Sequence, residues 1–321
     1  MRYVEAGGVR LSAIGVGTWQ FGSREWGYGQ QYAQTDAVDI VHRALDLGVN
    51  LFDTAEAYAF GKSERILGQA LDGRRDKAFV ATKILPLLPL APVVVQRGRS
   101  SRDRLGIDVI DLYQIHWPNP VVPLSQQMDG MGRLQRDGVI RHVGVSNYGL
   151  GRWQAAERAL GGPVLSNQVQ YSLVARGPDR ELVPWAATHD RIVIAYSPLG
   201  QGLLSARYDE TNVPGGVRAG NALFLPDNLR AARPLLTALR EVAAVHDATP
   251  AQVALAWVIR RPNVVAIPGA SSVRQLEQNV AAADIDLTDE EDERLTRASD
   301  AFRPTQGLAA VPKLAARRLH R

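Results

Sequence analysis

The chain of 321 residues contains no cysteine, which excludes disulfide bonds, thiolate catalysis, and zinc or iron–sulfur centres held by thiolates. It also lacks an apolar run of about 18 residues, the length that a membrane-spanning helix requires. Its opening, MRYVEAGGVRLS, has no apolar segment typical of a secretory signal. The histidines are scattered without the spacing of metal ligands, so we expect no metal. These absences predict a cytoplasmic protein that does not bind a membrane.

Strong charge is also missing, because the formal net charge is only +4. Residues 311–321 hold four basic side chains and no acidic one: Lys313, Arg317, Arg318 and Arg321. The rest of the chain is neutral, with 33 acidic residues matched by as many basic ones. A basic tail can bind nucleic acid or acidic lipid, but a tract this short favours a solvated terminus. We therefore expect no nucleic-acid partner, and the oligomeric state leaves no signal in the sequence.

Apolar runs rich in β-branched residues recur along the chain and alternate with stretches of helical periodicity. Each run is short and mostly apolar, as expected for a parallel strand that is buried on both faces. Eight strands alternating with helices predict an α/β protein with a closed (β/α)8 TIM barrel, and a doubly wound open sheet is the alternative. The expected strands are AIGVG (13–17), VNLF (49–52), AFVAT (78–82), VIDLYQI (109–115), IRHVGV (140–145), NQVQY (167–171), IVIAY (192–196) and VVAI (264–267).

Other segments complete the expected domain. The opening YVEAGGVRLS predicts a β-hairpin that turns at Gly7-Gly8 and closes the barrel floor. Residues 201–228 are polar, rich in Gly, Pro and Asn, and too long for an ordinary connection, so we predict a functional loop or lid there. Helix starts are expected at the capping patterns Thr249–Gln252 and Thr288–Glu291. No interdomain linker is evident, so we assign one domain, residues 1–303, and a short basic tail, residues 304–321.

Four residues suited to acid catalysis lie at or just beyond expected strand ends, which is where barrels carry catalytic groups. They are Asp53, Tyr58, Lys83 and His116. An adjacent ammonium would stabilise the phenolate and lower the tyrosine pKa from about 10. A carboxylate would hold the lysine charged, and a neutral imidazole would orient a substrate oxygen. Such a group is suited to protonating an oxygen while hydride reaches the attached carbon. Taken singly, Asp53 is equally explained as a helix cap and Lys83 as a surface residue, and a lone histidine such as His116 after a buried strand is more often a core residue.

Eight motifs, in order and at compatible spacing, resemble the aldo-keto reductase family over residues 2–302. They are GVGTWQFG (15–22), LFDTAEAYAFGKSERILGQAL (51–71), ATKI (81–84), DLYQIHWP (111–118), GVSNY (144–148), NQVQYS (167–172), YSPLGQGLL (196–204) and IPGASSVRQLEQN (267–279). The pattern is most similar to the bacterial branch that also resembles potassium-channel β subunits. The resemblance implies a (β/α)8 barrel, the cofactor NADP(H) and reversible reduction of a small-molecule carbonyl substrate by an NAD(P)H-dependent oxidoreductase.

The resemblance also implies roles for the four residues. Tyr58 would be the general acid, Lys83 and Asp53 the pair that tunes it, and His116 the group that orients the carbonyl. The alternative is an NADP(H)-binding regulatory or redox-sensing subunit with little turnover, as in the channel relatives. Those relatives depart from histidine at the position of His116, and its presence here favours an enzyme.

Cofactor contacts follow from the same resemblance. Ser146, Asn147 and Gln168 would bind the nicotinamide carboxamide, and Tyr196 would stack on the nicotinamide ring. The pyrophosphate would lie in the segment after Tyr196, covered by an arginine of the long loop. The residues implied there are Ser197, Pro198, Leu199, Gln201, Gly202, Arg207 and Arg218.

The adenosine end of the cofactor is expected at a helix N-terminus, a natural phosphate site. Ser271, Ser272 and Arg274 would bind the 2′-phosphate of NADP(H), and Gln278 and Asn279 would reach the adenine. Many relatives have a basic residue where Ser271 or Ser272 stands, so this chain departs from the family pattern there. The implied cofactor set is completed by Gly17, Thr18, Trp19, Asp53, Gly269 and Gln275.

Aromatic residues close to glycines mark the expected substrate pocket. The segment TWQFGSREWGYGQQY (18–32) lacks the spacing of ordinary core residues. By resemblance, this first loop borders the substrate, so Trp19 and Trp26 would form the pocket wall together with Trp117. The alternative is that these three side chains pack the barrel rim.

Overall fold

The computed structural model describes residues 1–24, 27–29, 34–305 and 307–312. Within these residues, eight parallel strands follow one another around a single sheet in chain order. Bridges from Ile14 to Ala266 and from Gly17 to Gly269 join its two ends, so the sheet closes into a barrel. The strands are β3 (Val16–Gly17), β4 (Leu51–Asp53), β5 (Phe79–Ile84), β6 (Ile110–Ile115), β7 (Ile140–Ser146), β8 (Ser166–Gln170), β9 (Ile192–Tyr196) and β10 (Val264–Ala266). The predicted (β/α)8 fold is confirmed.

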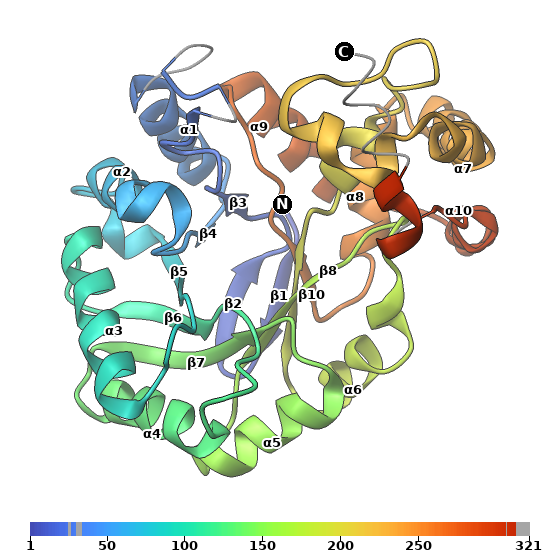
Figure 1. Cartoon of the computed structure of the whole chain (residues 1–321). Coiled ribbons are helices and arrows are strands. Elements are labelled where there is room, and N and C mark those ends of the chain that lie inside the picture. The colour runs from blue at the N-terminus through green and yellow to red at the C-terminus, as the bar shows by residue number, and fades with distance from the viewer. Residues whose placement is uncertain (25–26, 30–33, 306, 313–321) are drawn as a thin grey trace.

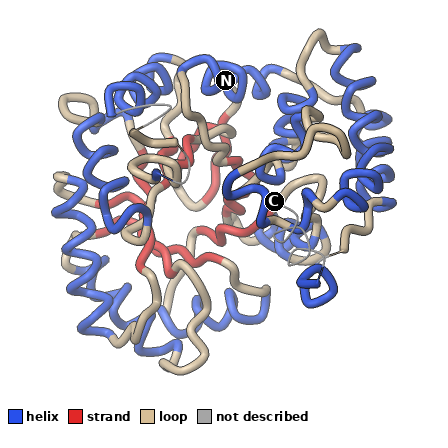
Figure 2. Tube along the Cα trace, turned by 45° about the horizontal axis from the view of Figure 1, so that its top comes forward, coloured by secondary structure: helices blue, strands red, loops and turns tan. Residues whose placement is uncertain are grey.

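Helices form an outer layer around this ring of strands (Figure 2). They are α1 (Gln34–Asp46), α2 (Lys62–Ala70), α3 (Ala91–Leu105), α4 (Leu124–Arg136), α5 (Leu150–Leu160), α6 (Leu182–Thr188), α7 (Pro226–Val245), α8 (Pro250–Ile259), α9 (Val273–Ala281) and α10 (Asp289–Ala301). Both predicted capping boxes are confirmed, at the starts of α8 and α10. Helices α7 and α10 pack against each other on one side of the molecule (Figure 1).

No single helix in the described part of the chain has the length and apolarity to cross a membrane. Helices α7 and α8 meet that criterion only as a pair, across a bend of 92°.

Alternation along the strands separates two apolar cores. Side chains on the outer face of the strands pack against the helices, as Val80 and Tyr113 do. Side chains on the inner face, such as Leu51, Ala81 and Leu112, pack together inside the barrel. Because side chains alternate with a period of two, each of these inward residues is followed two positions later by a polar residue at the carboxyl end of its strand. That inner face therefore begins apolar and ends in the polar cluster that forms the candidate site.

The predicted hairpin is confirmed as β1 (Tyr3–Ala6) and β2 (Val9–Ser12), paired antiparallel with Ala6 opposite Val9. Gly7 and Gly8 have φ values of +58° and +75°, as a tight two-residue hairpin turn requires. Val4 and Leu11 belong to the same apolar cluster as the inward-facing barrel residues. The hairpin therefore closes the barrel floor.

The segment 201–228 is only partly the open loop that the sequence predicts. It contains the short helical turns η5 (Gly200–Ser205), η6 (Gly216–Gly220) and η7 (Ala222–Phe224), and α7 already begins at Pro226. Leu204 and Phe224 are fully buried, so parts of the segment pack against the protein. The expected tail also starts with packed residues, because Thr305 and Asn228 exchange two hydrogen bonds. The four basic residues of the tail lie outside the described residues.

Candidate active site

A buried ion pair lies at the carboxyl ends of β4 and β5. The side chains of Lys83 and Asp53 are 0% and 2% exposed, and Lys83 Nζ donates to Asp53 Oδ2 over 2.6 Å. Lys83 Nζ also donates to the carbonyl oxygen of Thr54 over 2.8 Å and to Tyr58 Oη over 3.2 Å. Burial lowers the pKa of Lys83, but the negative charge and hydrogen bond of Asp53, together with Tyr58, raise this pKa above its usual value. The lysine is therefore held as an ammonium beside the phenol.

Two glutamines fix the second oxygen of Asp53. Gln168 Nε2 donates to Asp53 Oδ1 over 2.7 Å, and Gln114 Nε2 lies 3.5 Å from the same oxygen. Gln114 lies on β6 and Gln168 on β8, and both side chains are buried. Gln168, which the sequence predicts at the nicotinamide carboxamide, donates its own amide N–H to this carboxylate. Gln114 was not singled out from the sequence, although its position two residues after inward-facing Leu112 indicates its direction.

Tyr58 lies on a left-handed turn between β4 and α2. The next three residues, Ala59, Phe60 and Gly61, have φ values of +46°, +55° and +78°. Non-glycine residues in this region each cost roughly 1–2 kcal/mol, so the surroundings must hold the turn. Burial raises the pKa of Tyr58 more than the positive charge of Lys83 lowers it, so its pKa lies above the usual value. Our expectation of a lowered tyrosine pKa is therefore wrong for this structure, because burial outweighs the lysine. The phenol remains protonated at neutral pH, as a proton donor must.

His116 follows β6 and faces the phenol ring. The ring centroids of His116 and Tyr58 are 5.8 Å apart in an edge-on arrangement. Burial, with the positive charge of Lys83, lowers the pKa of His116 to about 3. This confirms the expectation of a neutral imidazole. Within the described residues, the buried Nδ1 atom has no hydrogen-bond partner.

Two of the three expected pocket tryptophans flank this group. The ring centroid of Trp19 lies 6.5 Å from that of Tyr58, and that of Trp117 lies 6.3 Å from that of His116. Their exposed fractions of 47% and 48% are unusual for such large apolar side chains. Trp26 lies outside the described residues. An aromatic surface that faces solvent beside a polar cluster is available to a ligand.

The residues expected at the nicotinamide form a connected cluster at the ends of β7 and β9. Asn147, with a φ of +63°, donates through Nδ2 to the carbonyl oxygen of His116 over 3.1 Å and to Ser146 Oγ over 3.0 Å. The hydroxyl of Tyr196 donates to Asn147 Oδ1 over 3.0 Å. These contacts join Tyr196 and Ser146 to the histidine through one side chain.

The residues expected at the pyrophosphate lie in the turn after β9. Ser197 and Gln201 have φ values of +49° and +56°, and Gly202 has a φ of +100°. Pro198 and Leu199 lie between them in the same turn. Arg218 Nε donates to the carbonyl oxygen of Gln201 over 2.8 Å, whereas Arg207 is exposed and its Nε lies 3.3 Å from Ser205 Oγ. Of the two expected arginines, Arg218 is thus the one bound directly to this turn.

At the start of α9, the expected phosphate site is a capped helix end. Ser272 is the N-cap residue and its Oγ accepts from the backbone N–H of Gln275 over 3.2 Å. The side-chain oxygen of Gln275 accepts from the backbone N–H and the hydroxyl of Ser271. Arg274 and Gln278 are exposed, while Asn279 is buried and donates to the carbonyl oxygen of Gly269. The first turn of α9 carries no acidic residue.

Other expected cofactor residues belong to the barrel seam. A Cβ on Gly17 would come within 2.7 Å of the carbonyl oxygen of Ile267, so glycine is needed for closure at this position. Thr18 is fully buried, and its hydroxyl donates to the carbonyl oxygen of Asp53 over 3.0 Å and bonds to Ser63 Oγ. The polar atoms of Thr18 therefore support the turn that follows Asp53.

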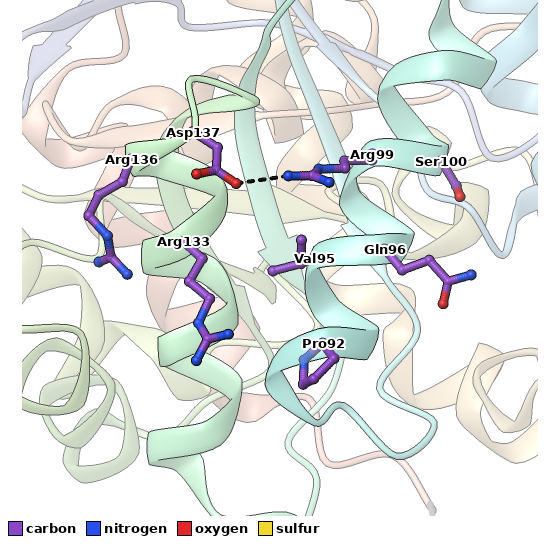
Figure 3. Close-up of a pocket in the computed structure, with 8 residues that line it drawn as sticks. All are labelled: Pro92, Val95, Gln96, Arg99, Ser100, Arg133, Arg136 and Asp137. Atoms are coloured by element: carbon purple, nitrogen blue, oxygen red, sulfur yellow. Dashed lines mark hydrogen bonds and ion pairs between the residues drawn. The ribbon is translucent and has the colours of Figure 1, made fainter.

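A hollow of about 670 Å³ lies elsewhere, on the outer surface between α3 and α4 (Figure 3). Its lining includes Arg99, Arg133 and Arg136, and Arg99 pairs with Asp137 over 2.9 Å. None of the four candidate catalytic residues lines this hollow. The hollow is therefore separate from the candidate active site at the carboxyl ends of the strands.

Comparison with known proteins agrees with this geometry. The sequence profile described as the Aldo/keto reductase family matches residues 13–300. The chain belongs to the aldo/keto reductase family. An uncharacterised oxidoreductase of Mycobacterium tuberculosis is 57% identical over 305 residues, covering 95% of this chain and 94% of the relative. An NADH-specific methylglyoxal reductase of Escherichia coli is 32% identical over 304 residues, with coverages of 88% and 92%.

Among solved structures, an aldo/keto reductase of Klebsiella pneumoniae in complex with NADP and acetate superposes with a TM-score of 0.75. The two chains are 32% identical, and the match covers 94% of this chain and 95% of the other. Membership of the family makes this aldo/keto reductase an NAD(P)H-dependent oxidoreductase that interconverts carbonyls and alcohols.

Proposed function

We propose that this aldo/keto reductase uses NADPH to reduce small aldehydes and ketones to alcohols, with Tyr58 as the proton donor. The observation that carries the proposal is the position of Lys83 Nζ, which lies 2.6 Å from Asp53 Oδ2 and 3.2 Å from Tyr58 Oη. Proton donor, charge and counter-charge thus form one chain of contacts, with the neutral ring of His116 beside the donor.

Each residue of this group has a step that its chemistry suits. NADPH, when bound, supplies the hydride that reaches the carbonyl carbon. Tyr58 Oη donates its proton to the carbonyl oxygen as negative charge develops there. Lys83 stabilises both that developing charge and the phenolate that remains on Tyr58. His116, which is neutral, donates a hydrogen bond to the carbonyl oxygen and so orients it toward the phenol.

Asp53 acts on the lysine and does not touch the substrate. A buried ammonium without a counter-charge loses its proton readily, because burial disfavours the charged form. The carboxylate of Asp53 prevents that loss, and Gln168 and Gln114 hold the carboxylate in position. In alcohol oxidation the same contacts work in reverse, with the Tyr58 phenolate accepting the proton.

The residues around this group fit a dinucleotide with a 2′-phosphate. Small and basic residues (Ser271, Ser272 and Arg274) begin α9, and the first turn has no carboxylate. A carboxylate is the group that typically binds the free ribose 2′-hydroxyl of NAD. Ser146, Asn147 and Tyr196 would meet the nicotinamide end, and Arg218 would lie over the pyrophosphate at Gln201. The solved Klebsiella relative binds NADP, whereas the Escherichia coli relative is NADH-specific.

The half-exposed rings of Trp19 and Trp117 would form the wall for the substrate. Such rings accept apolar or aromatic carbonyl compounds, and sugars also stack on them.

Turnover with a carbonyl panel tests the proposal. Wild-type protein with NADPH or NADH would be mixed in turn with nitrobenzaldehyde, methylglyoxal, an aldose and a ketosteroid, and the loss of reduced-cofactor absorbance recorded. We expect turnover of at least one carbonyl, with a lower KM for NADPH than for NADH. Tight NADPH binding without turnover on any carbonyl would instead favour the cofactor-sensing subunit.

A further inference from the structure

A partly buried ionic network, formed by two buried glutamates and two partly exposed arginines, lies beside the turn that carries Tyr58. We propose that Arg104 and Glu56 are positioning residues, which hold the hydroxyl of Tyr58 at hydrogen-bonding distance from Lys83 Nζ for proton transfer. The inference rests on the proposed role of Tyr58 as proton donor. It is drawn from two sets of contacts, one before Tyr58 in the chain and one after it.

Contacts of Glu56 fix the position of the chain just before Tyr58. Its side chain is 8% exposed. Its Oε1 accepts from the backbone N–H of Leu85 over 2.5 Å, and its Oε2 accepts from Arg97 Nε over 3.1 Å. Its own backbone N–H donates to the carbonyl oxygen of Lys83 over 3.2 Å. The residue two positions before the phenol is therefore bound to the end of β5 and to α3.

Contacts of Arg104 fix the position of the chain just after Tyr58. A Cβ added to Gly61 would come within 2.7 Å of Arg104 Cδ and 2.8 Å of Arg104 Nε, so the arginine side chain packs directly on this glycine. The same Nε donates to Glu64 Oε2 over 2.5 Å, and Glu64 is fully buried at the start of α2. Across the network, Arg104 Nη2 lies 3.8 Å from Glu56 Oε2. One side chain thus connects the segments on both sides of the phenol.

The turn has backbone hydrogen bonds of its own, from the N–H of Lys62 to the carbonyl oxygens of Tyr58 and Ala59, but its backbone conformation is disfavoured. Ala59 and Phe60 adopt left-handed backbone conformations that side chains disfavour. The ring of Phe60 is 98% exposed and packs on nothing that would fix the turn. Helix α2, which follows, has no side-chain cap at its N-terminus. The phenol position therefore depends on Glu56 and Arg104, and small errors in such a position reduce proton transfer strongly.

Helix α3 supplies a matched control. It carries Arg104 on the face toward the Tyr58 turn, whereas Arg99 lies on the outer face and pairs with exposed Asp137 (Figure 3). Removing Arg104 alone would leave Glu64 buried without its cation. The working variant is therefore the double substitution Glu64→Gln/Arg104→Ala, which removes both charges together, and Arg99→Ala is the control.

The test is a double-mutant cycle on kcat, with each change made in the wild-type and the Tyr58→Phe backgrounds. With Tyr58 present, Glu64→Gln/Arg104→Ala should lower kcat at least about tenfold while KM for NADPH changes less than about twofold. In the Tyr58→Phe background the same change should lower the residual kcat less than about twofold, since no proton donor is left to misplace. Arg99→Ala should leave kcat unchanged. An equal loss in both backgrounds would overturn the inference, because it would show a general structural effect.

Backbone hydrogen exchange separates this inference from the proposed function. Residues 55–64 should exchange faster in Glu64→Gln/Arg104→Ala than in wild type or Arg99→Ala. Faster exchange in a protein whose wild type turns over no carbonyl would support the network and reject the proposed function. Unchanged exchange, or unchanged kcat with Tyr58 present, would reject the network whatever the protein turns over.

Discussion

Replacing Asp53 by asparagine removes the counter-charge of a lysine that has no contact with solvent. The new side chain has nearly the same shape, but an NH2 group replaces one oxygen that accepts from Lys83 or Gln168, so the substitution removes the charge and one hydrogen bond. Breaking a buried ion pair by removing one partner costs about 3–5 kcal/mol, because the other charge is left uncompensated. The free energy of unfolding of natural domains is only about 5–15 kcal/mol. Asp53→Asn should therefore lower the free energy of unfolding at pH 7 by a large fraction of its total.

The loss should also depend on pH, with a definite sign. In wild type, the pKa of Lys83 lies above its usual value. The stability that this shift contributes is complete below a pH of about 10.4, the lysine pKa in the unfolded chain, and is lost only as pH rises through the folded pKa. In Asp53→Asn the counter-charge is gone, so burial outweighs the remaining contact with Tyr58 and the folded pKa of Lys83 should fall below that of the unfolded chain. The unfolded state then binds more protons, so stability rises with pH, by at most about 1.4 kcal/mol per pH unit.

Urea unfolding at pH 7 and pH 9.5 measures both effects. We expect the unfolding midpoint of Asp53→Asn to lie roughly 1 M or more below that of wild type at pH 7. The difference between the urea midpoints of the variant and of wild type should be smaller at pH 9.5. Asp137→Asn is the control, because Asp137 pairs with Arg99 at the surface and such pairs contribute about 0–1 kcal/mol. A midpoint equal to that of the control at pH 7, or a difference that is no smaller at pH 9.5, would refute the buried-pair reasoning.

Three further predictions concern other parts of the site. Because the pKa of His116 is about 3, titration of this histidine should cause no change in kcat/KM between pH 5 and pH 8. A pH-dependent change in this range that disappears in His116→Gln would show that the ring is not neutral. Arg274→Ala should raise the Kd for NADPH about tenfold and the Kd for NADH little. Fluorescence titration measures both constants, with Arg297→Ala as the control. An equal rise for the two cofactors would remove the 2′-phosphate role. Gly61→Ala should lower stability by about 1–3 kcal/mol, more than Gly73→Ala does, because a Cβ on Gly73 meets nothing within 4 Å.

The positions of the four central residues were predictable because they depend on local patterns. A buried parallel strand has a clear apolar signature, and the residue that follows its carboxyl end faces the barrel mouth. His116 follows β6 directly, whereas β4 extends to Asp53 and β5 one residue past Lys83, so the predicted strand ends are right to within two residues. The hairpin at Gly7-Gly8 and the capping boxes of α8 and α10 were predictable for the same reason, since each depends on neighbouring residues.

Features that depend on distant residues were not predictable. Arg104 follows Glu64 by 40 residues, and no local pattern joins it to Glu64 and Glu56 in one network. The left-handed conformation of Ala59 and Phe60 has no signal in those residue types. The tyrosine pKa was predicted in the wrong direction because the lysine is visible in the motif, whereas the degree of burial is a property of the folded barrel. The start of α7 at Pro226 did carry a signal, a proline at the first helical position, but it was outweighed by the polar composition of the loop.

Single-turnover reduction by Tyr58→Phe tests the central claim most directly. Protein with NADPH already bound would be mixed with excess carbonyl substrate, and the loss of NADPH absorbance followed in time for wild type and variant. With Tyr58 as the proton donor, the variant should react about 10²–10⁴ times more slowly, while its Kd for NADPH stays within about twofold of wild type because the phenol hydroxyl is not placed in the cofactor site. An equal rate in the two proteins would show that the proton comes from another group, and the mechanism built on Tyr58, Lys83 and Asp53 would be wrong.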